Sequence, residues 1–214
     1  EEMEYYLKND VTNISIYAED PELLKDVDPE RIKMATAARQ KKTKHLMKYT
    51  MNDMVSWLVV SIPTPGWAAK VYPDLPLDQA VEKLWDDIFT FCRITGDGKA
   101  IEKWEDHIET LNRRGKLLNE KQFKELRYKS DNGTDLKVGL CKNHIWMTAA
   151  SYNDNKVRFV PNMPTEEIFT APDRNKINGR LKSTKPLSYN GVLIDGMDLT
   201  FKDGKVVEFS AEKG

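Results

Sequence analysis

The 214-residue sequence has little cysteine, no long apolar run and no excess of charge of either sign. Its two cysteines, Cys92 and Cys141, lie far apart in unlike contexts, which predicts reduced thiols and a reducing compartment such as the cytoplasm. No apolar run approaches the roughly 20 residues that a membrane helix needs, so no membrane partner is expected. The 33 basic and 34 acidic residues nearly cancel, which argues against a nucleic-acid partner.

Common catalytic and nucleotide-binding motifs are also missing from the sequence. No glycine-rich phosphate loop follows a predicted strand, so an α/β nucleotide-binding domain is disfavoured. There is no HExxH, CxxC or GxSxG motif. The histidines, His45, His107 and His144, share no ligand spacing. His107 lies off the apolar stripe of its predicted helix, and we expect it to be solvated, whereas a structural role is expected for His144.

Residues 1–125 predict part of an N-terminal α/β domain, with a mixed or parallel sheet and helices. The predicted strands are 13–18 and 55–62, and the second is a continuous apolar run typical of a buried parallel strand. The predicted helices are 28–48, which begins with an Asp-Pro capping pair, 74–92, 101–111 and a short helix over 119–123.

From Leu126 the hydrophobic period becomes two, and residues 126–214 predict a β-rich meander. The strand-like runs are 126–129, 135–140, 144–147 and 177–185, followed by shorter runs towards the C-terminus. Turn sequences lie at 131–133, 190–191, 195–196 and 203–204, and each contains the Asn-Gly or Asp-Gly pair that favours hairpins. We expect the chain to be an excerpt of a longer two-domain protein.

Two adjacent carboxylates, Glu166 and Glu167, lie in a proline-bounded segment over residues 159–172. The prolines before Thr165 predict an extended backbone and a turn. Ionised carboxylates are hard oxygen ligands, suited to a divalent cation. The local pattern alone favours a different interpretation, in which Thr165 is a helix N-cap and both glutamates lie in the first helical turn, where negative charge suits the helix dipole.

Several stretches, in one order along the whole chain, resemble the thermophilic-type metallo-aminopeptidase family that includes aminopeptidase T, aminopeptidase S and PepS-like enzymes. The resemblance is carried by Pro65-Gly66-Trp67-Ala68, by Gly133-Thr134-Asp135-Leu136, by His144-Ile145-Trp146 and, most densely, by residues 161–172. It covers about the middle half of a family member, so residues 126–214 would form the truncated start of the catalytic domain.

The resemblance implies a cytoplasmic, typically homodimeric exopeptidase that removes N-terminal residues from a peptide substrate with two divalent metal ions, Zn, Co or Mn. It implies that Glu167 is a metal ligand, and whether Glu166 faces the metals instead stays open. The remaining ligands, a glutamate, two histidines and an aspartate with a tyrosine nearby, are expected beyond Gly214.

Because one carboxylate supplies too few oxygens for tight metal binding, we expect this chain alone to be inactive and to bind metal weakly, if at all. The alternative is a non-catalytic binding or dimerisation module.

Overall fold

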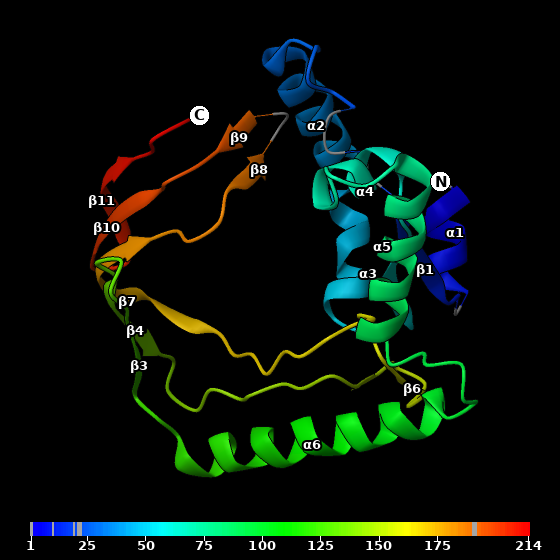
Figure 1. Cartoon of the computed structure of the whole chain (residues 1–214). Helices are drawn as coiled ribbons and strands as arrows, with labels where there is room; N and C mark the ends of the chain where they lie inside the picture. The colour runs from blue at the N-terminus through cyan, green and yellow to red at the C-terminus, as the bar shows by residue number, and fades with distance from the viewer. Residues whose placement is uncertain (1, 10, 19, 21–22, 190–191) are drawn as a thin grey trace. The chain divides into compact units, whose positions relative to one another are not determined.

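The computed structural model describes residues 2–9, 11–18, 20, 23–189 and 192–214 (Figure 1). The chain divides into two compact units. Unit 1 comprises Glu1–Asn112 and Thr148–Glu167, and unit 2 comprises Arg113–Met147 and Ile168–Gly214. The domain boundary at 125/126 stays a prediction.

Unit 1 contains a parallel strand pair, β1 (Asn13–Tyr17) and β2 (Trp57–Ser61), in which Ile14 lies opposite Leu58. Both strands were predicted, the second as a buried parallel strand, and the structure adds that they pair with each other. Every residue of β2 is half-buried rather than fully buried. A short hairpin of β5 (Ser151–Tyr152) and β6 (Arg158–Phe159) completes the strands of this unit.

The helices of unit 1 follow the predicted order. They are α1 (Glu2–Lys8), α2 (Pro29–Thr43), the 3-10 helix η1 (Lys44–Leu46), α3 (Met47–Met51), α4 (Pro65–Val71), α5 (Leu77–Phe91) and the first half of α6 (Ala100–Lys121). Helix α2 begins as expected, because the Asp28 carboxylate accepts a hydrogen bond from the amide of Glu30.

The apolar stripe of α5 packs in the core of unit 1, as its period predicted. Ala80 and Leu84 are buried against Ala68 of α4. On α6, the residues Trp104, Ile108 and Leu111 are buried at helical spacing. The amphipathic period alone therefore located the core faces of both helices.

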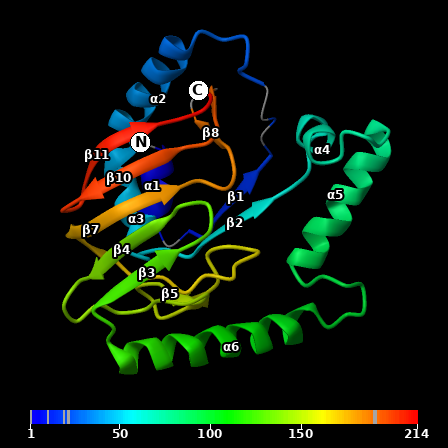
Figure 2. The same cartoon turned by 60° about the vertical axis from the view of Figure 1, so that its left-hand side comes forward.

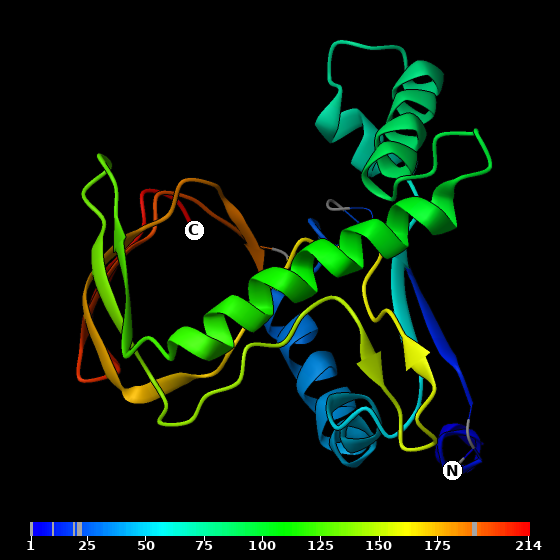
Figure 3. The same cartoon turned by 90° about the horizontal axis from the view of Figure 1, so that it is seen from below.

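The third predicted helix, over residues 119–123, is wrong as a separate element. Helix α6 runs without a break from Ala100 to Lys121 and is the longest helix among the described residues (Figure 3). It ends where Gln122 adopts a positive φ of 47°. No glycine or proline lies between 101 and 119 except Gly115, and one glycine does not end a helix that tertiary packing supports.

Unit 2 is built on an antiparallel five-stranded sheet in the order β11-β10-β7-β4-β3 (Figure 2). The strands are β3 (Glu125–Lys129), β4 (Asp135–Leu140), β7 (Pro172–Lys182), β10 (Asp198–Lys202) and β11 (Lys205–Ser210). A separate pair joins β8 (Leu187–Tyr189) to β9 (Val192–Ile194). The fold class, an α/β part followed by a β-rich region, is confirmed.

Two of the predicted hairpin turns are confirmed, at 131–133 between β3 and β4 and at 203–204 between β10 and β11. The turn at Asp195-Gly196 is wrong as a hairpin, because β9 pairs with β8 whereas β10 pairs with β7 and β11. The chain there leaves one sheet and enters another. The remaining turn, Asn190-Gly191, lies outside the described residues.

The strand predicted over His144–Met147 is also wrong. Only Met147 bridges another backbone segment, at Phe169. The neighbouring backbone groups are satisfied by side chains from α6 instead: Asn119 Oδ1 accepts from the amide of Trp146 at 2.7 Å, and Asn119 Nδ2 donates to its carbonyl at 3.1 Å. An amide side chain that provides both a donor and an acceptor replaces a partner strand here.

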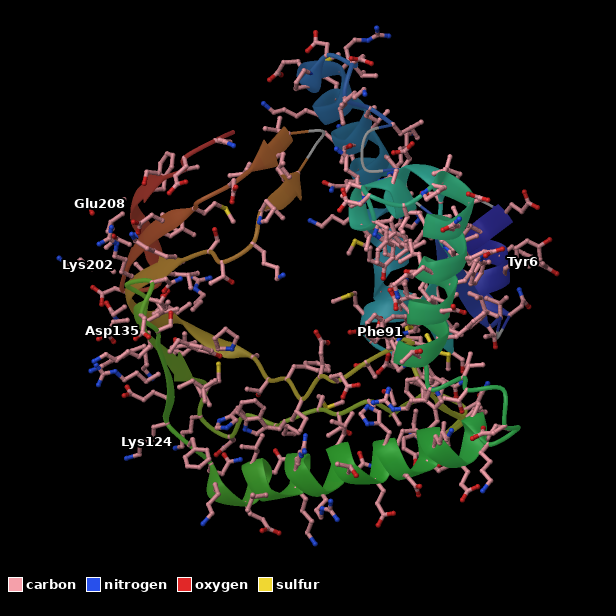
Figure 4. All side chains as sticks on the ribbon, viewed as in Figure 1. Tyr6, Phe91, Lys124, Asp135, Lys202 and Glu208 are labelled. Atoms are coloured by element: carbon pink, nitrogen blue, oxygen red, sulfur yellow. The ribbon has the colours of Figure 1, made fainter. Side chains whose placement is uncertain are left out.

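The five-stranded sheet has one charged face. Asp135, Lys202 and Glu208 project from the same side of the sheet in Figure 4. On this face Arg127 pairs with Asp135 at 3.0 Å, and Arg180 Nε donates to Asp198 at 2.7 Å. These guanidinium hydrogen bonds hold the pKa of both carboxyls below the ordinary value.

The near-zero net charge is a sum over two units of opposite sign. Unit 2 carries 17 basic and 10 acidic residues, a formal charge of +7, and unit 1 carries 16 basic and 24 acidic residues, a formal charge of −8. The composition argument against a nucleic-acid partner holds for the whole chain and not for unit 2 by itself. No helix of the described residues has the length and apolarity needed to cross a membrane.

Candidate metal-ligand segment

The backbone before the two glutamates lies along β2. The amide of Val59 donates to the carbonyl of Pro161 at 2.8 Å, and the amide of Met163 donates to the carbonyl of Val59 at 3.0 Å. Asn162 therefore forms a parallel bridge with Val59. This confirms the extended backbone that the prolines predicted, and it anchors the segment to a strand rather than to a loop.

Thr165 does not begin a helix, so the N-cap interpretation is wrong. Its hydroxyl accepts a hydrogen bond from the amide of Glu167 at 3.2 Å, but no helix forms over residues 165–171. The physical reason is the carbonyl of Thr165, which an N-cap would offer to its own helix. Here that carbonyl lies 2.8 Å from Nε2 of His107, on α6.

Arg93 follows α5 in a backbone conformation that normally selects glycine. Its φ is 61°, its amide donates to the carbonyl of Thr90, and the amide of Ile94 donates to that of Phe89. These bonds form a Schellman motif with Arg93 at the left-handed position. A residue with a Cβ is less favourable there than glycine.

The guanidinium of Arg93 connects α5, α6 and the Thr165–Glu167 segment. Its Nη2 lies 2.5 Å from Oε1 of Glu166 and 3.0 Å from Nδ1 of His107. The guanidinium carbon lies 5.3 Å from the ring centre of Trp104, within cation–π range. Only 22% of the Arg93 side chain is exposed, whereas 69% of Glu166 is exposed.

These contacts assign the tautomer of His107. The carbonyl of Thr165 only accepts, so Nε2 carries the hydrogen, and the guanidinium of Arg93 only donates, so Nδ1 carries the lone pair. The expectation that His107 is solvated is wrong, because its side chain is only 11% exposed. The helix period placed His107 off the apolar stripe. The period does not show whether the polar side of a helix faces solvent or another segment of the chain.

Glu167 differs from its neighbour. It is exposed, and among the described residues no side chain pairs with its carboxylate. Glu166, in contrast, is ion-paired to Arg93, and its Oε2 lies 3.5 Å from Nε2 of His107. The carboxylate with capacity for a further cation is therefore that of Glu167.

The described residues do not provide a complete metal site. No group of three or more His, Cys, Asp or Glu side chains converges among them in a way that could hold an ion. The carboxylate of Glu167 could supply one metal ligand, and a single carboxylate does not fit a two-metal centre by itself.

The other histidines and the cysteines take no part in this segment. His45 lies 3.6 Å from Glu4 on the surface of unit 1. In unit 2, Nδ1 of the buried His144 donates to the carbonyl of Cys141 at 2.9 Å, which supports a structural role for His144. Cys92 and Cys141 are free thiols, and burial raises the pKa of Cys92.

Sequence reasoning did not identify Arg93 as part of this segment. The available signal was an arginine directly after the last apolar residue of a helix, with the first glycine only at Gly96. Its partner Glu166 is 73 residues away, a separation that no local pattern reveals.

Known proteins share both the sequence and the fold. A family model described as thermophilic metalloprotease (M29) matches residues 1–214. The chain is 44% identical to aminopeptidase 2 of Geobacillus stearothermophilus over 99% of the chain and 51% of that protein, and 41% identical to aminopeptidase PepS of Streptococcus thermophilus over 100% and 51%.

A solved structure, wild-type AmpT from Thermus thermophilus, superposes with a TM-score of 0.90 at 33% identity, covering 100% of the chain and 52% of that protein. The chain thus spans about half the length of the relatives that it matches.

Proposed function

The chain belongs to the thermophilic metalloprotease (M29) family, and from this we propose that it is part of an aminopeptidase that hydrolyses N-terminal residues from peptides. Relatives named as aminopeptidases match it over nearly its whole length, which supports the proposal. The same relatives are about twice as long, so the activity is proposed for a protein that contains a second half like theirs.

Within that enzyme we assign Glu167 the role of metal ligand. The single observation that carries this assignment is the difference between the two adjacent carboxylates: Glu166 is paired with Arg93, and Glu167 is exposed with no partner among the described residues. An ionised carboxylate without an internal partner keeps its full charge and its lone pairs for a divalent cation.

The chemistry of such a site comes from the metal ions, which act as Lewis acids when bound. The contribution of this chain is to present one carboxylate at a fixed place. Two divalent ions, Zn, Co or Mn, a peptide substrate, a homodimer and a cytoplasmic location are parts of the proposal that the family resemblance suggests. With a single ligand, the purified 214-residue chain is expected to be inactive.

A chimeric enzyme tests the proposal. The stretch of the Geobacillus aminopeptidase 2 that this chain matches is replaced by this chain, and hydrolysis of leucine p-nitroanilide is measured with added Co²⁺. We expect turnover in the chimera, and a loss of at least ~100-fold in Glu167→Gln, because removal even of groups that only support metal ligands costs about 10–100-fold. Bound metal is measured in the same samples.

Glu166→Gln is the matched control, since it makes the same chemical change one residue away. It is expected to retain activity within about tenfold, because the carboxylate of Glu166 is paired with Arg93 and is not assigned as a metal ligand. Full activity and full metal content in the Glu167→Gln chimera would leave the non-catalytic binding or dimerisation module as the better description of the chain. Turnover by the purified chain alone would contradict the expected inactivity.

A further inference from the structure

The two adjacent glutamates are chemically identical, so something outside the pair must decide which of them meets a cation. The sequence left this question open. In the structure their surroundings differ: the guanidinium of Arg93 lies 2.5 Å from Oε1 of Glu166, and Nε2 of His107 lies 3.5 Å from its Oε2.

We propose that Arg93, supported by His107, is a positioning residue that occupies Glu166 and thereby reserves Glu167 for the metal. The inference rests on the proposed function, because it concerns the metal ligand assigned there. It concerns Arg93, which follows α5, and His107 of α6, which the sequence did not connect with the Glu166–Glu167 pair.

The backbone of Arg93 supports the inference. At the left-handed position of a Schellman motif glycine is the favoured residue, and the residue here is an arginine with a φ of 61°. Its side chain makes four interactions: the ion pair with Glu166, the hydrogen bond to His107 Nδ1, the contact with Trp104 and a local hydrogen bond from Nη1 to the carbonyl of Phe91. Glycine would provide none of them.

The environment of His107 supports it independently. Its Nε2 donates to the carbonyl of Thr165, the residue before the pair, while its Nδ1 accepts from Arg93. One imidazole therefore fixes both the backbone that precedes the glutamates and the guanidinium that pairs with the first of them. His107 is itself held between Arg93 and the edge of Trp104, whose ring centre lies 5.8 Å from that of the imidazole.

Charge explains how this arrangement selects a ligand. A divalent ion bound to Glu166 would lie within a few Å of the Arg93 guanidinium and would be repelled by it. It would also have to displace a charge-assisted hydrogen bond. We expect these effects to weaken cation binding at Glu166 on the order of tenfold relative to Glu167.

Paramagnetic line broadening can measure this preference on the chain itself, without relying on turnover. Mn²⁺ is titrated into the ¹⁵N-labelled chain, and broadening of the amide resonances of residues 165–168 is followed. With Arg93 intact, we expect Glu167→Gln to remove most of the broadening in this segment. Glu166→Gln should leave the broadening within about twofold of the unmutated chain.

Arg93→Gly then tests the role of the arginine. It removes the side chain and places the favoured residue at the left-handed position, so the helix end is retained. In the Arg93→Gly background, the preference of the cation for Glu167 over Glu166 is expected to fall to about twofold. Glu167→Gln then no longer removes most of the broadening. Lys156→Gly is the matched control, since Lys156 is also basic with a φ of 63° and takes no part in the segment. It should retain the wild-type pattern.

Arg93→Lys is a second variant, which keeps the positive charge and should retain most of the preference. If Glu166→Gln and Glu167→Gln reduce the wild-type broadening equally, or if Arg93→Gly retains the wild-type pattern, the positioning role is wrong while a metal at this segment stands. If the wild-type segment is not broadened even at millimolar Mn²⁺, the positioning role is wrong for this chain, whereas the metal role of Glu167 is decided by the metal content of the Glu167→Gln chimera, and the two failures are thus distinguishable.

Discussion

The replacement of a partner strand by Asn119 makes a sharp prediction about stability. Asn119→Asp keeps the size of the side chain and the acceptor for the amide of Trp146. It removes the donor to the carbonyl of Trp146 and places an oxygen there, 3.1 Å from another oxygen. Trp146 is only 9% exposed, so water cannot easily replace the lost donor.

The expected cost is the lost hydrogen bond, about 1 kcal/mol, plus the penalty for a buried carbonyl left without a donor, about 1–2 kcal/mol. We therefore expect Asn119→Asp to lower the free energy of unfolding by roughly 2–3 kcal/mol near pH 7. Denaturant unfolding followed by circular dichroism measures this, and faster hydrogen exchange at the amide of Trp146 shows that the loss is local.

Asn132→Asp is the matched control. Asn132 makes the same two kinds of bond, accepting from the amide of Thr134 at 3.0 Å and donating to the carbonyl of Lys182 at 3.1 Å, but it is exposed. Water can take over the lost donor there, so the cost should stay below about 1 kcal/mol.

The pH dependence of the Asn119→Asp variant provides a second check. A protonated carboxyl can donate to the carbonyl of Trp146 again, so the folded state favours the neutral form and raises the pKa of the introduced carboxyl. Stability is then regained below the ordinary carboxyl pKa of about 4 and lost as the pH rises through the raised value. Equal costs at positions 119 and 132, or a cost at 119 that does not change with pH, would refute the reasoning.

Two further predictions concern acid stability and a hairpin turn. Hydrogen bonds from Lys103 and from a backbone amide lower the pKa of Asp97 to about 2. The contribution of Asp97 to stability is therefore present above pH 4 and lost as the pH falls through 2. Asp97→Asn should flatten the decline in unfolding free energy between pH 4 and pH 2. Gly204→Ala should cost more than about 2 kcal/mol in thermal or denaturant unfolding, because its Cβ would lie 1.6 Å from the carbonyl oxygen of Arg174. Gly96→Ala, at a similar φ of 72° with no atom within 4 Å of the added Cβ, should cost only about 1 kcal/mol, and equal costs would show that the turn can move aside.

The errors of sequence interpretation have specific physical causes. Residues 144–147 have the composition of a strand, but Asn119 satisfies the backbone of Trp146 from a helix. Thr165 has the side chain of an N-cap, but its carbonyl is bonded to His107. In both places a side chain distant in sequence satisfied a backbone group on which the local pattern depended.

The elements that follow from a repeating pattern were predicted well. The stripe of α5, the alternation of β3 and β4 and the turn at 203–204 depend on neighbours within a few residues, and the sequence by itself determined them. It also placed two carboxylates on an extended, proline-bounded segment. The family resemblance carried by the same stretches is confirmed by the match over residues 1–214.

The resemblance implied Glu167 as the ligand, but only the tertiary structure showed that Glu166 has a cationic partner, because Arg93 is 73 residues away in the chain. The tertiary structure also showed that His107, which was expected to be solvated, lies between Arg93 and Thr165. The period of a helix shows which residues share a face, but it does not show which other part of the protein packs against that face. Which carboxylate already has a cationic partner depends on that contact, since an ion pair forms where the fold brings opposite charges together.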